Sequence, residues 1–358
     1  MKIALEATLA QTHKTGTGKY VYHLLKTLSE IDKGNEYFLL YDNKDWSGPN
    51  FGVNFLPVSY SSAANMFTGT HALSKVLKKI KPDIYHATRA ISIPPIHSYP
   101  VVSTIHDIYP ILDKSKQSSF ISFFSKEPIK CVVEYSDFFL FNSMFTKLEF
   151  SIFFNVPDTK GQVIYLGPSV KVEPIESKDK SGNFMICPSG IEKRREQLFL
   201  LDVYKELFYQ NKDIPNLIFI GDDRGEGSEL ARRIKDFKLE NKVIWEKDLP
   251  RDEIINYYKK ASLFLLPSSY EGFGIPLAEA MFAHIPVICS DISVFREVAR
   301  DYPVAYARLR DKSDWIEQIN RFYKKSHKLN IKTADKLLEE RNWQTCASKT
   351  LNCYKSLV

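Results

Sequence analysis

Several features are scarce or missing in this chain of 358 residues. No apolar run approaches the roughly 18–20 residues that a membrane span needs. The N-terminus turns polar at Glu6 and lacks the apolar core of a secretory signal. The cysteines are scattered, odd in number and form no Cys-x-x-Cys pair, which argues against a disulfide framework or a zinc site. These absences predict a protein of the cytoplasm.

Charge is also not concentrated anywhere. The net charge is +6, but neither half of the chain forms a basic domain and there is no basic tail, which argues against a nucleic-acid partner. The hydrophobic fraction of 44% is enough for two α/β domains, each with its own core.

Short apolar segments alternate with helical patterns along the whole chain. This alternation is typical of βαβ units, in which a parallel sheet is covered by helices on both faces. It predicts an α/β protein made of two doubly wound, Rossmann-like domains that face a cleft. The predicted strands cover 2–6, 37–41, 55–58, 83–86, 101–105, 138–141, 184–187, 217–221, 242–245, 263–266 and 286–290, and one clear helical pattern covers 194–209.

A stretch with prolines, a charged run and no periodicity interrupts the pattern after residue 166. We expect a first domain over 1–166, a linker over 167–182 and a second domain over 183–340. The last segment, 341–358, is expected to be a helix that packs back towards the first domain.

The segment between the two strands at 263–266 and 286–290 carries most of the functional information. A loop with Gly272 and Gly274 leads into a helix that is expected to start near Ile275. A helix N-terminus at the carboxyl end of a buried strand favours a bound anion, and the two glycines would let the ligand approach the backbone. Glu271 is expected to face uncharged groups such as sugar hydroxyls, and Glu279 to accept hydrogen bonds from a ribose. Taken alone, each carboxylate has a simpler interpretation, as a solvated loop residue or a dipole-favourable helix residue.

Two adjacent arginines, Arg194 and Arg195, follow the first strand of the second domain. Guanidinium groups form forked hydrogen bonds to phosphate oxygens, so the pair is a candidate diphosphate site. A solvated basic corner is the alternative interpretation.

The segment Glu271-Gly272-Phe273-Gly274-Ile275-Pro276-Leu277-Ala278-Glu279-Ala280-Met281 resembles the hallmark of the retaining GT-B glycosyltransferases of family 4, which has two glutamates separated by seven residues. Arg194 matches the arginine of that family's phosphate pair, and Arg195 stands where relatives usually have lysine. The resemblance implies that Phe273 and Ile275 border the donor with the residues already named.

The first domain carries two weaker matches. Gly16-Thr17-Gly18 lies where the family has a glycine-rich loop beside the donor, although a lone Gly-x-Gly is weak by itself. His106, in the sequence His106-Asp107-Ile108-Tyr109-Pro110, resembles the family's histidine near the reacting sugar carbon. The resemblance implies that His106 hydrogen-bonds a sugar hydroxyl. A His-Asp pair alone is more often structural.

The resemblance implies transfer of a hexosyl unit from a nucleotide-diphosphate sugar to a hydroxyl of a glycan or lipid-linked acceptor, in surface polysaccharide or lipopolysaccharide assembly. Arg194, Arg195, Glu271 and His106 are the candidate catalytic residues. The resemblance to mannosyltransferases makes GDP-mannose the first donor to test, and it implies retention at the anomeric carbon. The chain has no Asp-x-Asp in a suitable context, so we predict no metal and no other cofactor.

Alternatives remain at this point. Strand–turn–helix units also serve sugar epimerases and nucleotide-dependent oxidoreductases, although Val21 breaks the Gly-x-Gly-x-x-Gly pattern of the latter. A non-catalytic partner subunit would keep the same fold. Peripheral membrane contact is predicted at an apolar cluster beside lysines, where an inward-packed helix is the plainer interpretation. The cluster consists of Phe120, Ile121, Phe123 and Phe124.

Overall fold

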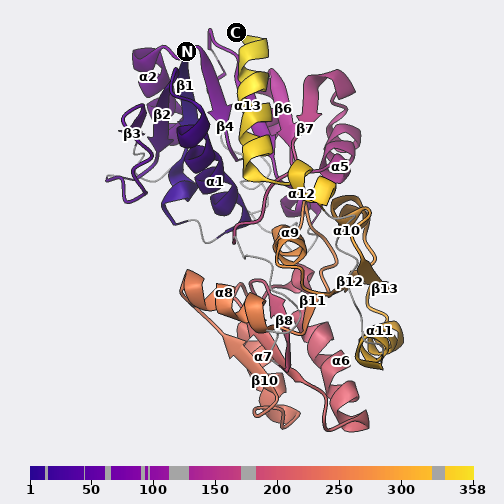
Figure 1. Ribbon diagram of the computed structural model, residues 1–358. Helices are drawn as coiled ribbons and strands as arrows, with labels where there is room; N and C mark the ends of the chain where they lie inside the picture. Colours follow the sequence, from indigo (N-terminus) through magenta and orange to yellow (C-terminus); the bar gives the residue numbers. More distant parts are fainter. Residues whose placement is uncertain are drawn as a thin grey trace. The chain divides into compact units, whose positions relative to one another are not determined.

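The computed structural model describes the chain apart from residues 13–14, 44, 61–65, 90–92, 96, 113–128, 171–182 and 325–334. The chain divides into two compact units (Figure 1). The first contains residues 1–169 and 341–358, and the second contains residues 170–340. Most of the expected linker and the whole cluster Phe120, Ile121, Phe123 and Phe124 lie outside the described residues.

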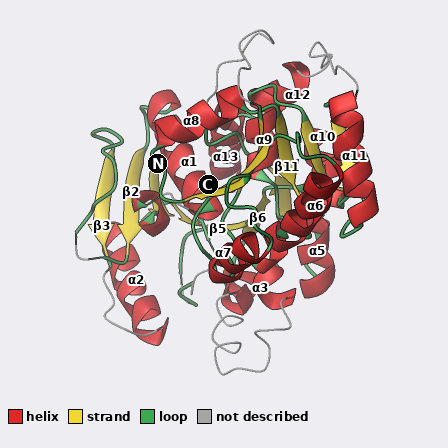
Figure 2. Cartoon of the chain, turned by 90° about the horizontal axis from the view of Figure 1, so that it is seen from below, coloured by secondary structure: helices red, strands yellow, loops and turns green. Residues whose placement is uncertain are grey.

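The first unit is built on a parallel sheet in the order β3-β2-β1-β4-β5-β6-β7. The strand β3 lies at its outer edge, next to β2 (Figure 2). The chain reverses its direction of progress between β1 and β4, so the carboxyl ends of these two strands form a switch point where ligands of such sheets commonly bind. The strands are β1 (Lys2–Glu6), β2 (Glu36–Tyr41), β3 (Phe55–Ser59), β4 (Ile84–Ala87), β5 (Val101–Ile105), β6 (Phe138–Phe141) and β7 (Gly161–Val163).

The second unit has a parallel sheet in the order β10-β9-β8-β11-β12-β13. Its switch point lies between β8 and β11, where Ile186 pairs with Phe264. The loops that leave these two strands are therefore expected to meet. The strands are β8 (Phe184–Pro188), β9 (Asn216–Ile220), β10 (Val243–Glu246), β11 (Leu263–Leu266), β12 (Val287–Ser290) and β13 (Val304–Ala307).

The sequence predicted each of these strands to within one residue at each end, except β7 and β13. Strands such as β5 and β11 are buried along their whole length, which is why their apolar runs are so clear. The two missed strands lie at sheet edges and are short and only partly buried, so they lack that signal.

Helices connect the strands and cover the sheets. Two shorter turns in the first unit, η1 (Thr8–Gln11) and η3 (Asp158–Lys160), are 3₁₀ helices. The α-helices are α1 (Gly16–Ile31), α2 (Met66–Ile80), α3 (Tyr109–Leu112), α5 (Met144–Phe154), α6 (Gln197–Gln210), α7 (Gly227–Asp236), α8 (Arg251–Lys260), α9 (Ile275–Phe282), α10 (Ser293–Ala299), α11 (Lys312–Lys324), α12 (Asp335–Glu340) and α13 (Trp343–Leu357). None of the described helices is long and apolar enough to cross a membrane.

The last helix, α13, returns to the first unit and packs beside α1 (Figure 1). Asn342 caps its start by accepting a hydrogen bond from the Thr345 N–H at 2.8 Å. The indole N–H of Trp343 donates to the carbonyl of Pro168 at 2.7 Å. The two points where the chain leaves and re-enters the first unit are thus fastened together.

One helix start differs from the prediction. The sequence predicted a helix from residue 194, but Lys193–Arg195 form the 3₁₀ turn η4 and α6 begins only at Gln197. Glu196, between them, has the left-handed φ of 58° and separates the two segments. The two arginines therefore lie on a loop before the helix and do not oppose its dipole from its first turn.

Candidate functional site

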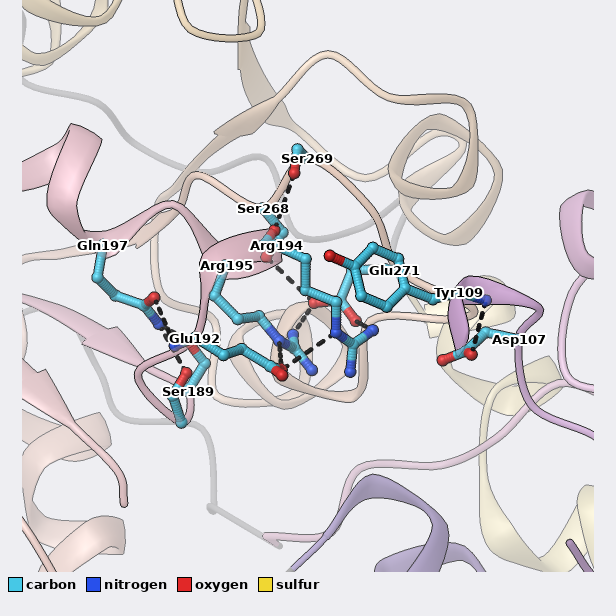
Figure 3. Close-up of polar contacts among 11 residues, drawn as sticks. Asp107, Tyr109, Ser189, Glu192, Arg194, Arg195, Gln197, Ser268, Ser269 and Glu271 are labelled. Carbon is cyan, nitrogen blue, oxygen red and sulfur yellow. Dashed lines mark hydrogen bonds and ion pairs between the residues drawn. The ribbon is translucent and has the colours of Figure 1, made fainter. Parts of the chain in front are cut away.

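Two loops meet at the switch point of the second sheet. One follows β8 and carries Arg194 and Arg195, and the other follows β11 and carries Glu271 (Figure 3). Both the N–H and the hydroxyl of Ser269 donate to the carbonyl of Arg194, at 2.8 and 3.1 Å. These bonds hold the two loops in register, although their residues are distant in the chain.

Arg195 and Glu271 form an ion pair between the Nη1 and Oε1 atoms. Their side chains are only 14% and 5% exposed. The hydroxyl of Ser268 also donates to Glu271 Oε1, at 3.1 Å. Burial, followed by the charge of Arg194, lowers the pKa of Arg195 to about 10. The ion pair between Arg195 and Glu271 is thus largely withdrawn from bulk water.

Glu192 is a second carboxylate in this cluster, for which the sequence predicted no role. Its Oε1 accepts from the Nε atoms of both arginines, at 3.1 Å from Arg194 and 3.2 Å from Arg195 (Figure 3). Nη1 of Arg194 also lies 3.9 Å from Glu271 Oε2. The two guanidinium groups are therefore balanced by two carboxylates, which orient them without a ligand.

The helix α9 begins at Ile275, as predicted. Gly274, the residue before it, has a φ of 90°, and a Cβ atom there would lie 2.8 Å from Cε1 of Phe295. Only glycine fits this conformation and this space. Pro276 has no N–H, and the N–H of Leu277 donates to the Gly274 carbonyl at 2.9 Å. The first turn therefore offers fewer free donors to an anion than the sequence predicted.

Glu279 is buried inside the second unit, at 2% exposure. The hydroxyl of Tyr258, on α8, donates to Glu279 Oε2 at 2.6 Å. Burial and the nearby Glu279 carboxylate raise the pKa of Tyr258 well above its usual value. The expected contact between Glu279 and a ribose stays a prediction, and its partner Tyr258 was not foreseen.

In the first unit, the predicted glycine-rich loop opens α1. Thr15 caps this helix, because its hydroxyl accepts from the Gly18 N–H at 3.0 Å. Gly16 is exposed and Thr17 is partly exposed, whereas Gly18 is buried. The Gly18 N–H is thus already used, and Gly16 and Thr17 are the members that a ligand can reach.

His106 follows β5 in the first unit. Its Nε2 lies 2.8 Å from the carbonyl of Thr88, and since a carbonyl can only accept, Nε2 carries the proton. Burial lowers the pKa of His106, so the ring is neutral and its Nδ1 keeps a lone pair. The ring of Tyr20, on α1, meets it edge-on at 4.9 Å. A neutral acceptor of this kind suits a hydroxyl donor.

A buried polar chain lies behind His106. His86 on β4 links the hydroxyls of Tyr354 and Thr104, at 2.5 and 2.7 Å, and Thr104 contacts the Tyr20 hydroxyl at 2.9 Å. Burial lowers the pKa of His86 to about 3. The chain joins α13 to the helix whose Tyr20 supports His106.

The structure thus brings Arg194, Arg195 and Glu271 together, with Gly272, Phe273, Gly274 and Ile275 following directly in the β11–α9 loop and at the helix start. His106, Gly16, Thr17 and Gly18 belong to the first unit. Across the described ranges, no group of three or more His, Cys, Asp or Glu side chains could hold a metal ion.

Solved structures share this architecture of two doubly wound units. An Anabaena protein, HepE, whose structure contains UDP and glucose, matches with a TM-score of 0.73 and 16% identity over 99% of both chains. The lipopolysaccharide glycosyltransferase WaaG matches with a TM-score of 0.73 and 11% identity over the full length of both. The protein therefore has the GT-B fold.

Family models identify the chain more closely. Residues 171–340 match the model described as glycosyl transferases group 1, and residues 14–170 match glycosyltransferase family 4. The chain belongs to this family of glycosyltransferases, which favours glycosyl transfer over the epimerase and oxidoreductase alternatives.

Two curated relatives are mannosyltransferases. The O-antigen chain mannosyltransferase RfbU of Salmonella typhimurium is 26% identical over 325 residues, which cover 87% of this chain and 88% of the relative. O-antigen chain mannosyltransferase B of Escherichia coli is 28% identical over 169 residues, 47% of this chain and 44% of the relative.

Proposed function

We propose that the protein transfers a mannosyl unit from GDP-mannose to a hydroxyl of a glycan or lipid-linked acceptor, in surface polysaccharide or lipopolysaccharide assembly. The full-length similarity to an O-antigen mannosyltransferase supports this sugar and this process. The observation that carries the proposal is the buried Arg195–Glu271 pair at the switch point of the second sheet.

The pair fits a diphosphate leaving group. When the anomeric C–O bond breaks, its electrons move to the phosphate oxygen, and the guanidinium groups of Arg194 and Arg195 stabilise the new charge. A carboxylate near phosphates would normally be repelled, but Arg195 offsets the charge of Glu271. Glu271 can then accept hydrogen bonds from sugar hydroxyls and orient the ring.

We propose retention through attack on the same face of an oxocarbenium-like sugar, in line with the transition state of related glycosyl chemistry. The acceptor hydroxyl forms the new C–O bond, and its proton passes to the departing phosphate oxygen. His106, neutral and with a free lone pair on Nδ1, accepts a hydrogen bond from a sugar hydroxyl. The cationic side chains supply the neutralisation, so the reaction is proposed to be independent of metal.

The test is release of nucleoside diphosphate from GDP-mannose, UDP-glucose, UDP-galactose and ADP-glucose, with and without acceptor glycans. We expect GDP-mannose to be consumed fastest, with no change after addition of EDTA. The anomeric configuration of the product, read by NMR, tests retention. Binding of the donor without any turnover would instead indicate a non-catalytic subunit, and turnover of another donor alone would contradict the mannosyl assignment.

We also propose peripheral contact with the inner face of a membrane through Phe120, Ile121, Phe123 and Phe124. A lipid-linked acceptor would lie there, and the segment combines apolar side chains with lysines. Sedimentation with anionic liposomes should be lost in the variant Phe123→Glu/Phe124→Glu. Unchanged sedimentation would reject this contact.

A further inference from the structure

A third arginine, Arg224, lies beside the Arg194–Arg195 cluster. It follows β9, and its N–H donates to the carbonyl of Ile191 at 2.9 Å, while the Ile191 N–H donates to the Asp222 carbonyl at 2.9 Å. Asp223 tightens the same loop by accepting from the N–H groups of Gly225 and Gly227, both at 2.8 Å. The backbone of Arg224 is therefore clamped to the loop that carries Arg194 and Arg195.

The side chain of Arg224 lies across Gly190. A Cβ atom at residue 190 would fall 2.6 Å from Nε and 2.7 Å from Cδ of Arg224, so the absence of a side chain there provides the space for this arginine. Gln197 holds Gly190 in place, because its Nε2 donates to the Gly190 carbonyl at 2.9 Å. Arg224 is an exposed residue. Its positive charge is one of the causes that lower the pKa of Arg195.

The order of the strands shows on which side of the Arg195–Glu271 cluster Arg224 lies. In the order β10-β9-β8-β11, the cluster of Arg195 and Glu271 lies at the ends of β8 and β11, and Arg224 lies at the end of β9. Neighbouring strands are about 4.8 Å apart. A nucleoside that continues from a diphosphate at the cluster towards β9 would bring its base over Arg224.

We propose that Arg224 is a further donor-binding residue, and that its guanidinium plane stacks on the base of the nucleoside diphosphate. This inference rests on the proposed function, since it needs the diphosphate at the Arg194–Arg195 cluster. A guanidinium is planar and weakly hydrated, and it stacks on aromatic rings, whereas a lysine ammonium acts only as a point charge. Stacking tolerates different bases, so Arg224 increases the affinity for nucleosides in general and contributes little to specificity for one base.

The test is calorimetric titration of the full-length protein with GDP and, separately, with inorganic pyrophosphate. The variant Arg224→Ala should bind GDP about tenfold more weakly, a change of about 1.4 kcal/mol, and bind pyrophosphate as the wild type does. Arg224→Lys should not restore the GDP affinity. Restoration by lysine, or an equal loss for both ligands, would make Arg224 a phosphate contact and overturn the stacking role.

Two further variants sharpen the test. Arg232→Ala removes an arginine that is paired with Glu229 and Asp236 on the surface of α7, and it should leave both affinities unchanged. Gly190→Ala should displace the Arg224 side chain and weaken GDP binding, with little added effect when Arg224 is already alanine. Unchanged GDP binding by Arg224→Ala would overturn this inference alone, whereas no binding of any nucleoside diphosphate by the wild type would overturn the proposed function as well.

Discussion

Nη1 of Arg195 contacts Oε1 of Glu271 across two loops that leave neighbouring strands, with both side chains largely buried. Removing one member of a buried ion pair leaves the other charge buried and unpaired. This costs about 3–5 kcal/mol of folding stability. Substitutions that change the charge or the shape of either side chain should therefore disturb the ion pair.

We predict that Arg195→Lys keeps activity within about tenfold of the wild type, because an ammonium still neutralises Glu271 and the family usually has lysine here. Arg195→Ala should lower kcat/KM at least a hundredfold and destabilise the fold by about 3 kcal/mol. Steady-state kinetics and urea unfolding of both variants measure this. Equal activity of the alanine and lysine variants would contradict the role of the positive charge.

The bond from Tyr258 to Glu279 gives a second prediction. Tyr258→Phe removes the donor that lies 2.6 Å from Glu279 Oε2, and it should destabilise the second unit by about 1–3 kcal/mol. If Glu279 binds the ribose, the KM for the donor should rise as well. Tyr257→Phe is the matched control, because Tyr257 donates to Glu246 at 3.0 Å in a less buried place. A donor KM that changes equally in both variants would argue against a ribose contact at Glu279.

His284 provides a test of backbone strain. It follows α9 with a φ of 51°, a left-handed conformation that glycine adopts most readily, and the Ile285 N–H closes the turn by donating to the Ala280 carbonyl. We predict that His284→Gly is more stable than His284→Ala by about 1 kcal/mol, the reverse of the order within a helix. Thermal unfolding of the two variants measures this difference in stability. A more stable alanine variant would show that the left-handed conformation carries no strain.

The buried His86 predicts a dependence of stability on pH. Its folded pKa is lowered to about 3, below the ordinary value of 6.5, so the unfolded chain binds more protons between these values. Its contribution to stability is present above pH 6.5 and is lost as the pH falls towards 3, by at most about 1.4 kcal/mol per pH unit.

The variant His86→Asn isolates this effect, because His106, whose pKa is also lowered, remains in both proteins. The difference in unfolding free energy between wild type and variant should shrink as the pH falls from 6.5 to 4. Replacement of the exposed His71 by Asn controls for the loss of a histidine as such. A constant difference for His86→Asn would contradict a neutral, buried imidazole.

The sequence predicted the two sheets because their strands are buried on both faces and appear as short apolar runs. It also predicted the start of α9 and placed Arg194, Arg195 and Glu271 at the ends of β8 and β11. Pairings between distant residues were not visible, since nothing in the local pattern connects Tyr258 with Glu279 or His86 with Tyr354.

Partners that are close in sequence were missed for another reason. Glu192 lies next to the arginines, but the left-handed turn at Glu196, which separates η4 from α6, gives no periodic signal. Arg224 was overlooked because the place of its side chain depends on Gly190, a residue of a different loop.

We propose above all that the diphosphate of a nucleotide sugar binds at Arg194, Arg195 and Glu271. The most direct measurement is calorimetric titration of GDP-mannose into the wild type and into Arg194→Ala. We predict binding of one donor per chain and an affinity at least tenfold weaker in the variant. Equal affinity in the two proteins, or no heat from the wild type with GDP-mannose, UDP-glucose, UDP-galactose and ADP-glucose, would contradict the claim.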